Sequence, residues 1–188
     1  GCILGNVTKL AHEYYKTVSD MYVARGVMRK GLIAACLFMA CKKQGVPRTC
    51  QEIAEIFQIS DKCVTRGNKK FTELWSLAGN KHISYKDECQ SCDYLARFCS
   101  KLYQDKNNTL LSKARNISQI CKDNSILSQN TPVSIAAASI YMATIMLDID
   151  SKVLRSDIAE VAKTSQVTIG KCYKEMMKHS EIFDSRCT

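Results

Sequence analysis

Two stretches of this chain are near copies of each other, and the repetition constrains the fold more than any other feature. Residues 31–40, GLIAACLFMA, match residues 134–143, SIAAASIYMA, at a separation of 103 positions. A second match follows each copy, because QEIAE at 51–55 corresponds to SDIAE at 156–160, now 105 positions apart. A match that survives a change in loop length indicates a tandem structural repeat. We therefore predict two copies of one folding unit.

Apolar residues recur at intervals of three and four along the chain, and Pro and Gly are scarce, with 2 and 8 residues. This periodicity predicts an almost entirely helical chain without strands. Each of the two copied stretches is apolar on every side, so each must form a central helix that other helices surround. Their alanines allow those neighbours to approach closely. The expected fold class is all-α, with two tandem helical repeats, each around a buried central helix.

Several residues mark the expected helix starts. Thr49 and Glu52 have the spacing of a capping box, in which each side chain bonds the other residue's backbone N–H, so a helix is expected to begin at Thr49. Ser60 is the expected N-cap of the next helix. The expected helices are, along the chain, 7–18, 28–43, one that begins at Thr49, 61–77, 87–103, 107–122, 131–147, 156–163 and 166–181.

These helices divide between two predicted domains. The first repeat is predicted to cover residues 1–79 and the second residues 86–188, with a linker over 78–86. The second repeat has five of the expected helices and the first only four. The first repeat is therefore expected to lack its opening helix, and the chain is interpreted as a fragment or a stable core.

Cysteine is abundant, with 11 residues in a chain of 188. In a chain of this length, rich in Ala, Ile, Leu and Met, free buried thiols are the preferred interpretation over a disulfide framework. The one close pair is Cys89 and Cys92, and no second pair or histidine follows at the spacing that structural zinc requires. The pair is interpreted as two positions one turn apart on a helix. A redox or metal role stays the alternative.

Positive charge is concentrated in the first half of the chain. The net charge is +9, and residues 1–85 carry 13 Lys and Arg against 6 Asp and Glu, whereas residues 86–188 carry 14 against 12. The first half is therefore expected to meet an acidic partner, either nucleic-acid phosphates or a carboxylate-rich protein surface. A solvated charged face is the alternative interpretation.

Several classes of function are disfavoured. The three histidines, His12, His82 and His179, are far apart in sequence and have no neighbouring nucleophile or carboxylate in the pattern of a catalytic triad. Neither a GxxxxGK[ST] loop nor a GxGxxG turn is present to hold a nucleotide. The longest apolar runs fall short of the roughly 20 residues that a bilayer span needs, and the first residues do not resemble a secretion signal. We therefore expect an intracellular binding module, neither an enzyme nor a membrane protein.

The spacing after each central helix fits a helix-turn-helix unit. In such a unit a small residue of the first helix allows a close crossing, and a β-branched residue ten positions later fills it. Ala54 with Val64 fits in the first repeat, and Ala159 with Ile169 fits in the second. A second helix with a polar and basic outer face can enter a major groove and neutralise phosphates. Plain core packing is the alternative, and neither turn has the glycine often found there. The outer-face residues are Lys62, Arg66, Lys69 and Lys70 in the first repeat and Thr168, Lys171 and Lys174 in the second.

Motifs spread over nearly the whole chain together resemble the core of transcription factor IIB. They are GVPRT at 45–49, RFCS at 97–100, PVSIAAA at 132–138 and VTI at 167–169. The resemblance implies two cyclin-like repeats and a general transcription initiation factor without catalytic activity. It implies binding to the TATA-binding protein, promoter double-stranded DNA and RNA polymerase, as a monomer. The expected location is the nucleus, or the cytoplasmic replication site if the chain is viral.

The resemblance also assigns candidate contact residues. The positions matching the family's contacts with the TATA-binding protein are Lys42 and Lys62, with Lys43 and Arg66 beside them. Downstream DNA would be approached through Arg25 and Gly26, with Arg29 and Lys30 nearby. On the last helix, the positions matching the family's contacts with upstream DNA are Val167 and Gly170, and the outer-face residues Thr168, Lys171 and Lys174 lie beside them.

Gly170 departs from the family's pattern. Many members carry an arginine at this position, so the chain is expected to lack a bidentate base contact worth roughly 1–3 kcal/mol of discrimination. Phosphate contacts are expected to remain through Lys171 and Lys174. The family's zinc ribbon is not in these residues, so zinc is expected only in a preceding segment and no cofactor within them. Two alternatives stay open, the related factor that serves RNA polymerase III and a cyclin that activates a kinase through the same fold.

Overall fold

The computed structural model describes four parts of the chain, residues 5–79, 90–102, 109–148 and 154–186. All regular elements within these parts are helices, as predicted. None of the described helices combines the length and the apolar character that a bilayer span requires. The chain separates into two compact units, residues 1–89 and 90–188. The predicted domain boundaries at 79 and 86 and the linker over 78–86 stay predictions, because residues 80–89 lie outside the described parts.

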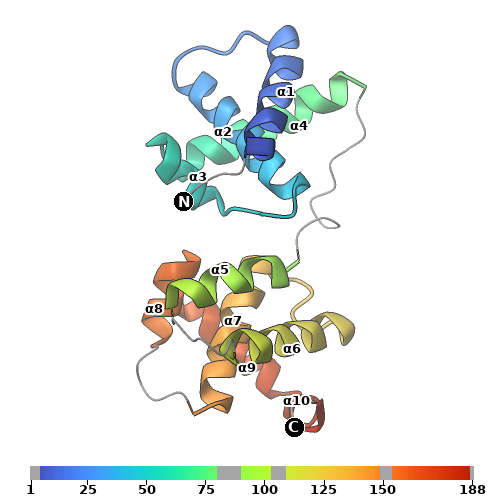
Figure 1. Cartoon of the computed structure of the whole chain (residues 1–188), viewed down its shortest axis with the longest axis vertical. Helices are drawn as coiled ribbons and strands as arrows, with labels where there is room; N and C mark the ends of the chain where they lie inside the picture. The colour runs from blue at the N-terminus through green and yellow to red at the C-terminus, as the bar shows by residue number, and fades with distance from the viewer. Residues whose placement is uncertain (1–4, 80–89, 103–108, 149–153, 187–188) are drawn as a thin grey trace. The chain divides into compact units, whose positions relative to one another are not determined.

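The first unit is built around one apolar helix, α2. Its described helices are α1 (Gly5–Met21), α2 (Gly26–Lys43), α3 (Cys50–Phe57) and α4 (Asp61–Leu77) (Figure 1). α2 packs against α1, α3 and α4, and all but one of the residues from Leu32 to Lys42 are buried. A helix with no polar face is stable only when neighbours cover all its sides. The prediction of a buried central helix is confirmed here.

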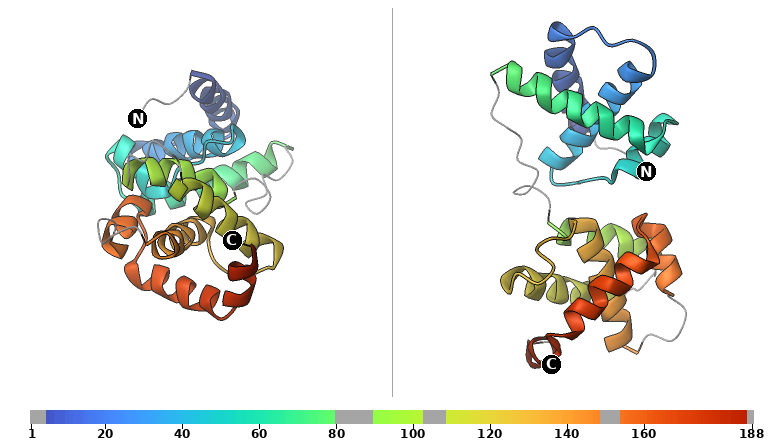
Figure 2. Two further views of the ribbon diagram at one scale, coloured as in Figure 1. Left: turned by 60° about the horizontal axis from the view of Figure 1, so that its bottom comes forward. Right: turned by 180° about the vertical axis from the view of Figure 1, so that it is seen from behind.

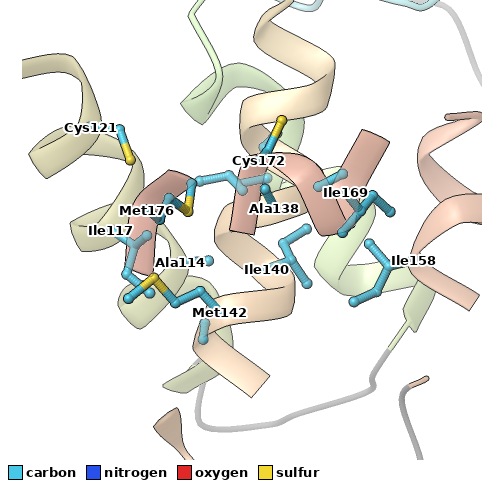
Figure 3. Packing of buried hydrophobic residues seen from close by; sticks show 14 of the residues in the cluster. Ala114, Ile117, Cys121, Ala138, Ile140, Met142, Ile158, Ile169, Cys172 and Met176 are labelled. Atoms are coloured by element: carbon cyan, nitrogen blue, oxygen red, sulfur yellow. The ribbon is translucent and has the colours of Figure 1, made fainter. Parts of the chain in front are cut away.

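The second unit repeats this arrangement around α7. Its described helices are α5 (Cys92–Leu102), α6 (Thr109–Asp123), α7 (Pro132–Met146), α8 (Arg155–Ala162), α9 (Gln166–Met177) and α10 (Ser180–Arg186) (Figures 1 and 2). α7 packs against α5, α6, α8 and α9. Figure 3 shows apolar side chains of these helices meeting around α7, among them Ile117 of α6, Ile158 of α8 and Ile169 of α9. The second copied stretch is therefore also a buried central helix, as predicted.

The neighbours of the two central helices correspond in chain order. α1, α3 and α4 pack on α2 in the first unit, and α6, α8 and α9 pack on α7 in the second. The additional helix of the second unit is α5, which packs on α6, α7 and α8. No helix within residues 5–79 corresponds to α5, so its position is that of the opening helix expected to be missing from the first repeat.

The backbones of α2 and α4 touch where these helices cross. A Cβ atom on Gly67 would lie 2.0 Å from the carbonyl oxygen of Gly31, and one on Gly31 would lie 2.8 Å from the carbonyl oxygen of Cys63. Because these obstructing atoms belong to the backbone, neither position has room for a side chain. The corresponding positions in the second unit are Ser134 and Cys172, and both side chains are buried. The second crossing therefore accommodates a side chain at each position.

An aromatic cluster connects α1 with α4 in the first unit. The ring centroid of Tyr14 lies 5.7 Å from that of Phe71 and 4.8 Å from that of Trp75. Phe71 and Trp75 stack at 5.4 Å. Such pairs contribute about 0.5–1.5 kcal/mol beyond the area they bury. Trp75 is the only tryptophan of the chain, so its fluorescence reports on the first unit alone.

The last predicted helix is interrupted in the structure. The periodicity predicts one helix over 166–181, but α9 ends at Met177 and α10 begins at Ser180. The backbone N–H of His179 donates to the carbonyl oxygen of Met176 at 2.9 Å, which closes a tight turn. This turn directs Phe183 into the apolar core, where it is fully buried, and α10 packs on α6. The free energy of burying this aromatic side chain explains why the helix does not continue.

The first helix of the second unit begins later than predicted. Residues 87–89 and 103 of the expected range lie outside the described parts, and α5 begins at Cys92. Before it, the carboxylate of Asp93 accepts the backbone N–H of Gln90 at 2.8 Å. This bond satisfies a donor ahead of the helix and favours its start at this point.

The cysteines within the described residues lie on helices and take part in no disulfide there, and most are buried, as the composition predicts. Burial raises the pKa of Cys36 and Cys121 to about 12 and the pKa of Cys99 to about 11. Such thiols are protonated at neutral pH and therefore unreactive. Cys92 is half-buried, and Cys89, the other member of its pair, lies outside the described residues.

Candidate nucleic-acid and protein interface

Each unit contains a helix-turn-helix pair after its central helix. α3 packs against α4 in the first unit, and α8 packs against α9 in the second. Ala54 and Val64 are buried in the first pair, and Ala159 and Ile169 are buried in the second. Small and branched residues at this spacing bring the two helices of a pair close together. The structure therefore contains both pairs that the spacing predicts.

The first pair begins with the predicted capping box. The Thr49 hydroxyl accepts the backbone N–H of Glu52 at 3.1 Å, and the Thr49 N–H donates to the Glu52 carboxylate at 2.9 Å. The Ser60 hydroxyl accepts the backbone N–H of Cys63 at 3.3 Å and caps α4. These bonds satisfy donors that a helix leaves unpaired at its start, and they fix where α3 and α4 begin.

The second pair is capped in a similar way. The Ser165 hydroxyl accepts the backbone N–H of Thr168 at 3.0 Å, which fixes the start of α9. At the start of α8, the backbone N–H of Leu154 donates to the carboxylate of Asp157 at 3.0 Å. Leu154 has no polar side chain to complete a reciprocal box, so α8 has only this half of the motif.

Both turns use a left-handed residue that is not glycine. Gln58 ends α3 with φ 51° and ψ 48°, and Lys163 ends α8 with φ 53° and ψ 45°. The left-handed conformation costs an L-residue roughly 1–2 kcal/mol, which is why glycine usually occupies it. Neither turn contains the glycine that is usual in helix-turn-helix units. Gln58 and Lys163 adopt the same left-handed conformation in its place, so the turn geometry is kept.

The outer face of α4 is basic. Lys62, Arg66 and Lys69 are exposed and lie four and three positions apart, which places them on one face of the helix. Lys70 lies to one side, where its Nζ pairs with the Glu73 carboxylate at 3.1 Å. The first helix-turn-helix pair thus presents three exposed cations in one row.

Lys42 and Lys43 occupy the last turn of α2, where cations interact favourably with the helix dipole. Lys43 is exposed, whereas Lys42 is only 5% exposed. Lys42 is therefore not the accessible cation that the motif comparison leads one to expect. The helices that pack on α2 cover this helix almost to its C-terminal end. The sequence alone does not show which of the two adjacent lysines they cover.

The turn between α1 and α2 presents a second set of cations. Arg25, Arg29 and Lys30 are exposed around the start of α2. The Arg29 Nε donates to the Tyr15 hydroxyl at 3.3 Å, which directs its guanidinium. Gly26 has a φ of +55°, a conformation that L side chains rarely adopt. The predicted residues are thus brought together at this turn.

The outer face of α9 is less basic and partly apolar. Val167 is 66% exposed, and Lys171 and Lys174 are exposed beside it. Their spacing of four and three positions places the three on one face. Gly170 lies on the same side of the helix, whereas the Thr168 hydroxyl takes part in the cap of α9.

One residue of this surface, Arg155, was not among the candidate contact residues predicted from the sequence. Arg155, at the start of α8, places its Nη1 atom 3.0 Å from where a Cβ on Gly170 would be. Its guanidinium carbon lies 5.9 Å from the ring centroid of Tyr141. Fifteen positions separate Arg155 from Gly170, and only the crossing of α8 and α9 brings them together. The sequence contains no local signal for this contact.

The two units share a packing order, and each presents a capped helix-turn-helix pair with cations on its outer face. These features define a class of tandem helical-repeat proteins with exposed cationic helices. A family model of the transcription factor TFIIB repeat matches the chain twice, over residues 3–74 and 85–179. The chain belongs to the TFIIB repeat family, which confirms the resemblance of its sequence motifs and the cyclin-like fold class.

Similar proteins occur in viruses, eukaryotes and archaea. A putative transcription initiation factor IIB-like protein of Acanthamoeba polyphaga mimivirus is 31% identical over 90% of this chain and 36% of its own length. Transcription initiation factor IIB of Drosophila melanogaster is 31% identical over 90% of this chain and 50% of its own length. Transcription initiation factor IIB of Methanopyrus kandleri is 32% identical over 91% of this chain and 52% of its own length. The chain thus spans between a third and about half of these relatives.

Proposed function

We propose that this chain is the promoter-binding core of a transcription initiation factor of the IIB type. Its two repeats bind the TATA-binding protein and promoter double-stranded DNA together, and the resulting complex helps to recruit RNA polymerase. The names of its relatives support this proposal. The observation that carries it is the capped helix-turn-helix pair with exposed cations in each unit. This function needs no catalysis and no cofactor in these residues.

The first repeat is proposed to contact both protein and DNA. Lys62 and Arg66 of α4, with Lys43 at the end of α2, bind the acidic surface of the TATA-binding protein. The exposed cations at the start of α2 approach DNA downstream of the TATA element. The net charge of +7 on residues 1–85 supports this division, because it attracts both acidic protein and phosphate. Lys42 contributes to this surface only through its charge, since its side chain is buried.

The second repeat is proposed to read DNA upstream of the TATA element. Lys171 and Lys174 bind phosphates and set the position of α9 in the major groove. The exposed Val167 contacts a thymine methyl group, since this group is the apolar feature of that groove. The protein acts where promoters are opened, in the nucleus or, for a viral chain, at a cytoplasmic replication site.

A charge reversal on α4 tests the contact with the TATA-binding protein. Lys62→Glu combined with Arg66→Glu places two carboxylates against an acidic surface, which costs several kcal/mol in protein interfaces. We expect the ternary complex with the TATA-binding protein and a TATA-containing duplex to weaken roughly a hundredfold. Binding to the duplex alone should change much less. Electrophoretic mobility shift with and without the TATA-binding protein measures both.

Lys9→Glu combined with Lys16→Glu is the matched control, because it changes the net charge equally on the exposed side of α1. An equal loss with this control would show that only total charge matters. An equal loss of α4-variant binding with and without the TATA-binding protein would show that Lys62 and Arg66 contact phosphate. If the unmodified chain forms no ternary complex, the proposal is wrong and a kinase-binding cyclin becomes the better hypothesis.

A further inference from the structure

The outer face of α9 lacks a side chain at its centre. Gly170 follows Val167 by three positions and precedes Lys174 by four, so the three lie on one side of the helix. Val167 and Lys174 are exposed, and Gly170 has no side chain to place between them. In helix-turn-helix units, residues from the N-terminal part of the second helix reach base edges. Gly170 is the fifth residue of α9, so the missing side chain is in that part.

The guanidinium of Arg155 occupies the space that Gly170 leaves. Its Nη1 atom lies 3.0 Å, and its Cζ atom 4.0 Å, from where the Cβ of residue 170 would begin. Arg155 is exposed, and no carboxylate of the described residues forms an ion pair with it. The positive group is therefore exposed beside α9, and no carboxylate of the described residues neutralises it.

One tyrosine contacts this arginine, and a second tyrosine packs against the first. The guanidinium carbon of Arg155 lies 5.9 Å from the ring centroid of Tyr141 on α7, within the range of a cation–π contact. Tyr173 of α9 meets Tyr141 edge-on, with centroids 5.1 Å apart and an interplanar angle of 76°. A guanidinium held in this way loses less conformational entropy when it binds a ligand. Tyr141 therefore favours a position of the Arg155 guanidinium beside α9, although α8 supplies the side chain.

We infer that Arg155 is a base-reading residue of the second repeat and that its ligand is a guanine edge in the major groove. A guanidinium can donate two parallel hydrogen bonds to O6 and N7 of guanine, which is the commonest specific contact in that groove. In this chain α8 delivers the guanidinium through the gap at Gly170. The inference rests on the proposed function, because it requires α9 to face DNA.

The test uses a library of duplexes with a TATA element and randomised bases upstream of it. The full chain and the TATA-binding protein select duplexes from this library, and the unmodified chain is expected to enrich a guanine at one position. Arg155→Lys keeps the positive charge but cannot make the bidentate contact. It is expected to bind the guanine-containing duplex roughly 5- to 100-fold more weakly, with little change for duplexes lacking that guanine.

A second variant changes the gap and leaves Arg155 in place. In Gly170→Ala the new Cβ would lie 3.0 Å from the Arg155 Nη1, which is the mobile end of a long side chain. The guanidinium should move while the fold is kept. We expect a melting temperature that does not fall, because alanine favours a helix interior more than glycine does, and a weakened guanine preference. Lys171→Ala is the control, because loss of a phosphate contact weakens binding to all duplexes alike and lowers the salt slope by about one.

The outcomes separate this inference from the proposed function. If the unmodified chain forms the ternary complex but enriches no guanine, or if Arg155→Lys keeps the preference, Arg155 does not read a base and the inference is overturned. The proposed function would stand in that case. If the unmodified chain forms no complex with the TATA-binding protein and any duplex, the proposed function fails, and the inference fails with it.

Discussion

Where the central helix crosses the last helix of the helix-turn-helix pair, the first repeat has Gly31 against Gly67, whereas the second has Ser134 and Cys172 at the corresponding positions. The first crossing is a contact between two backbones, and the second accommodates side chains. The end of the preceding short helix is nevertheless the same in both, with a left-handed residue at Gln58 or Lys163.

This difference shows which parts of the repeat can vary. The cap of the last helix, the turn before it and the buried helix are alike in both units, whereas the residues at the helix crossing and on the outer face differ. α4 presents a row of cations suited to an acidic protein surface or phosphate. α9 presents an exposed valine and fewer cations, and Arg155 of α8 lies beside it. One backbone arrangement therefore supports a row of exposed cations in one repeat and, in the other, the surface that we propose reads DNA.

The largest expected effect concerns the glycine crossing. In Gly67→Ala the new Cβ would lie 2.0 Å from the carbonyl oxygen of Gly31, so α2 and α4 must move apart. Overpacking of this kind costs about 3 kcal/mol or more. We expect the first repeat to lose that free energy of unfolding, as measured by urea denaturation followed through Trp75 fluorescence.

Two comparisons sharpen this result. Cys172→Ala at the corresponding position of the second repeat removes one buried sulfur and should cost only about 1 kcal/mol, measured by circular dichroism. Gly5→Ala adds a Cβ that meets no atom within 4 Å and should be neutral. A loss of less than about 1 kcal/mol in Gly67→Ala would show that the first crossing is as adaptable as the second.

The next effect is a loss of stability at alkaline pH. Burial raises the pKa of Cys36 from 9.0 to about 12, so the thiolate is favoured in the unfolded chain. The associated stability is complete below pH 9 and declines as the pH rises from 9 towards 12. Between pH 8 and pH 10 we expect Cys36 to account for about 1 kcal/mol of lost unfolding free energy.

Variants in the two repeats isolate this contribution. Cys36→Ala should reduce the pH dependence that Trp75 fluorescence reports for the first repeat, and the part that remains includes Cys50, whose pKa burial also raises. Cys121→Ala, which removes the comparable thiol of the second repeat, should leave that signal unchanged. A Cys36→Ala variant with the pH dependence of the unmodified chain would contradict the assignment.

The smallest effect should be the same in both repeats. Gln58→Gly and Lys163→Gly each relieve a left-handed residue at the turn, with φ of 51° and 53°. Because glycine also gains freedom in the unfolded chain, the net stabilisation should be about 0.5–1 kcal/mol for each. Thermal denaturation measures it, and Gln58→Ala, which keeps the strain, is the control. A gain in only one repeat would show that the turns are not equivalent.

The sequence predicted the features that depend on residues close together in the chain. Thr49 and Glu52 identified a helix start because a capping box is formed within three positions. Ala54 and Val64 identified the crossing of α3 and α4 because a helix pair has a fixed spacing. The two buried helices were predictable because a stretch that is apolar all round must be covered.

Features that depend on the packing of distant segments could not be predicted in this way. Lys42 and Lys43 look equivalent in sequence, and only the neighbours of α2 decide that the first is buried. Arg155 meets Gly170 because α8 crosses α9 at a particular angle. The interruption of the last helix depends on a place in the core for Phe183. Each of these is set by tertiary contacts, which periodicity does not contain.

The buried thiols give each repeat a probe of its own transient opening. A reagent that attacks only thiolates reaches Cys36 when α2 separates from its neighbours, and it reaches Cys121 when α6 does. These events occur in different repeats. The alkylation rates of the two cysteines therefore show which repeat undergoes local opening more often. Cys36 and Cys121 thus serve as native probes, without any substitution, of which repeat is the more rigid.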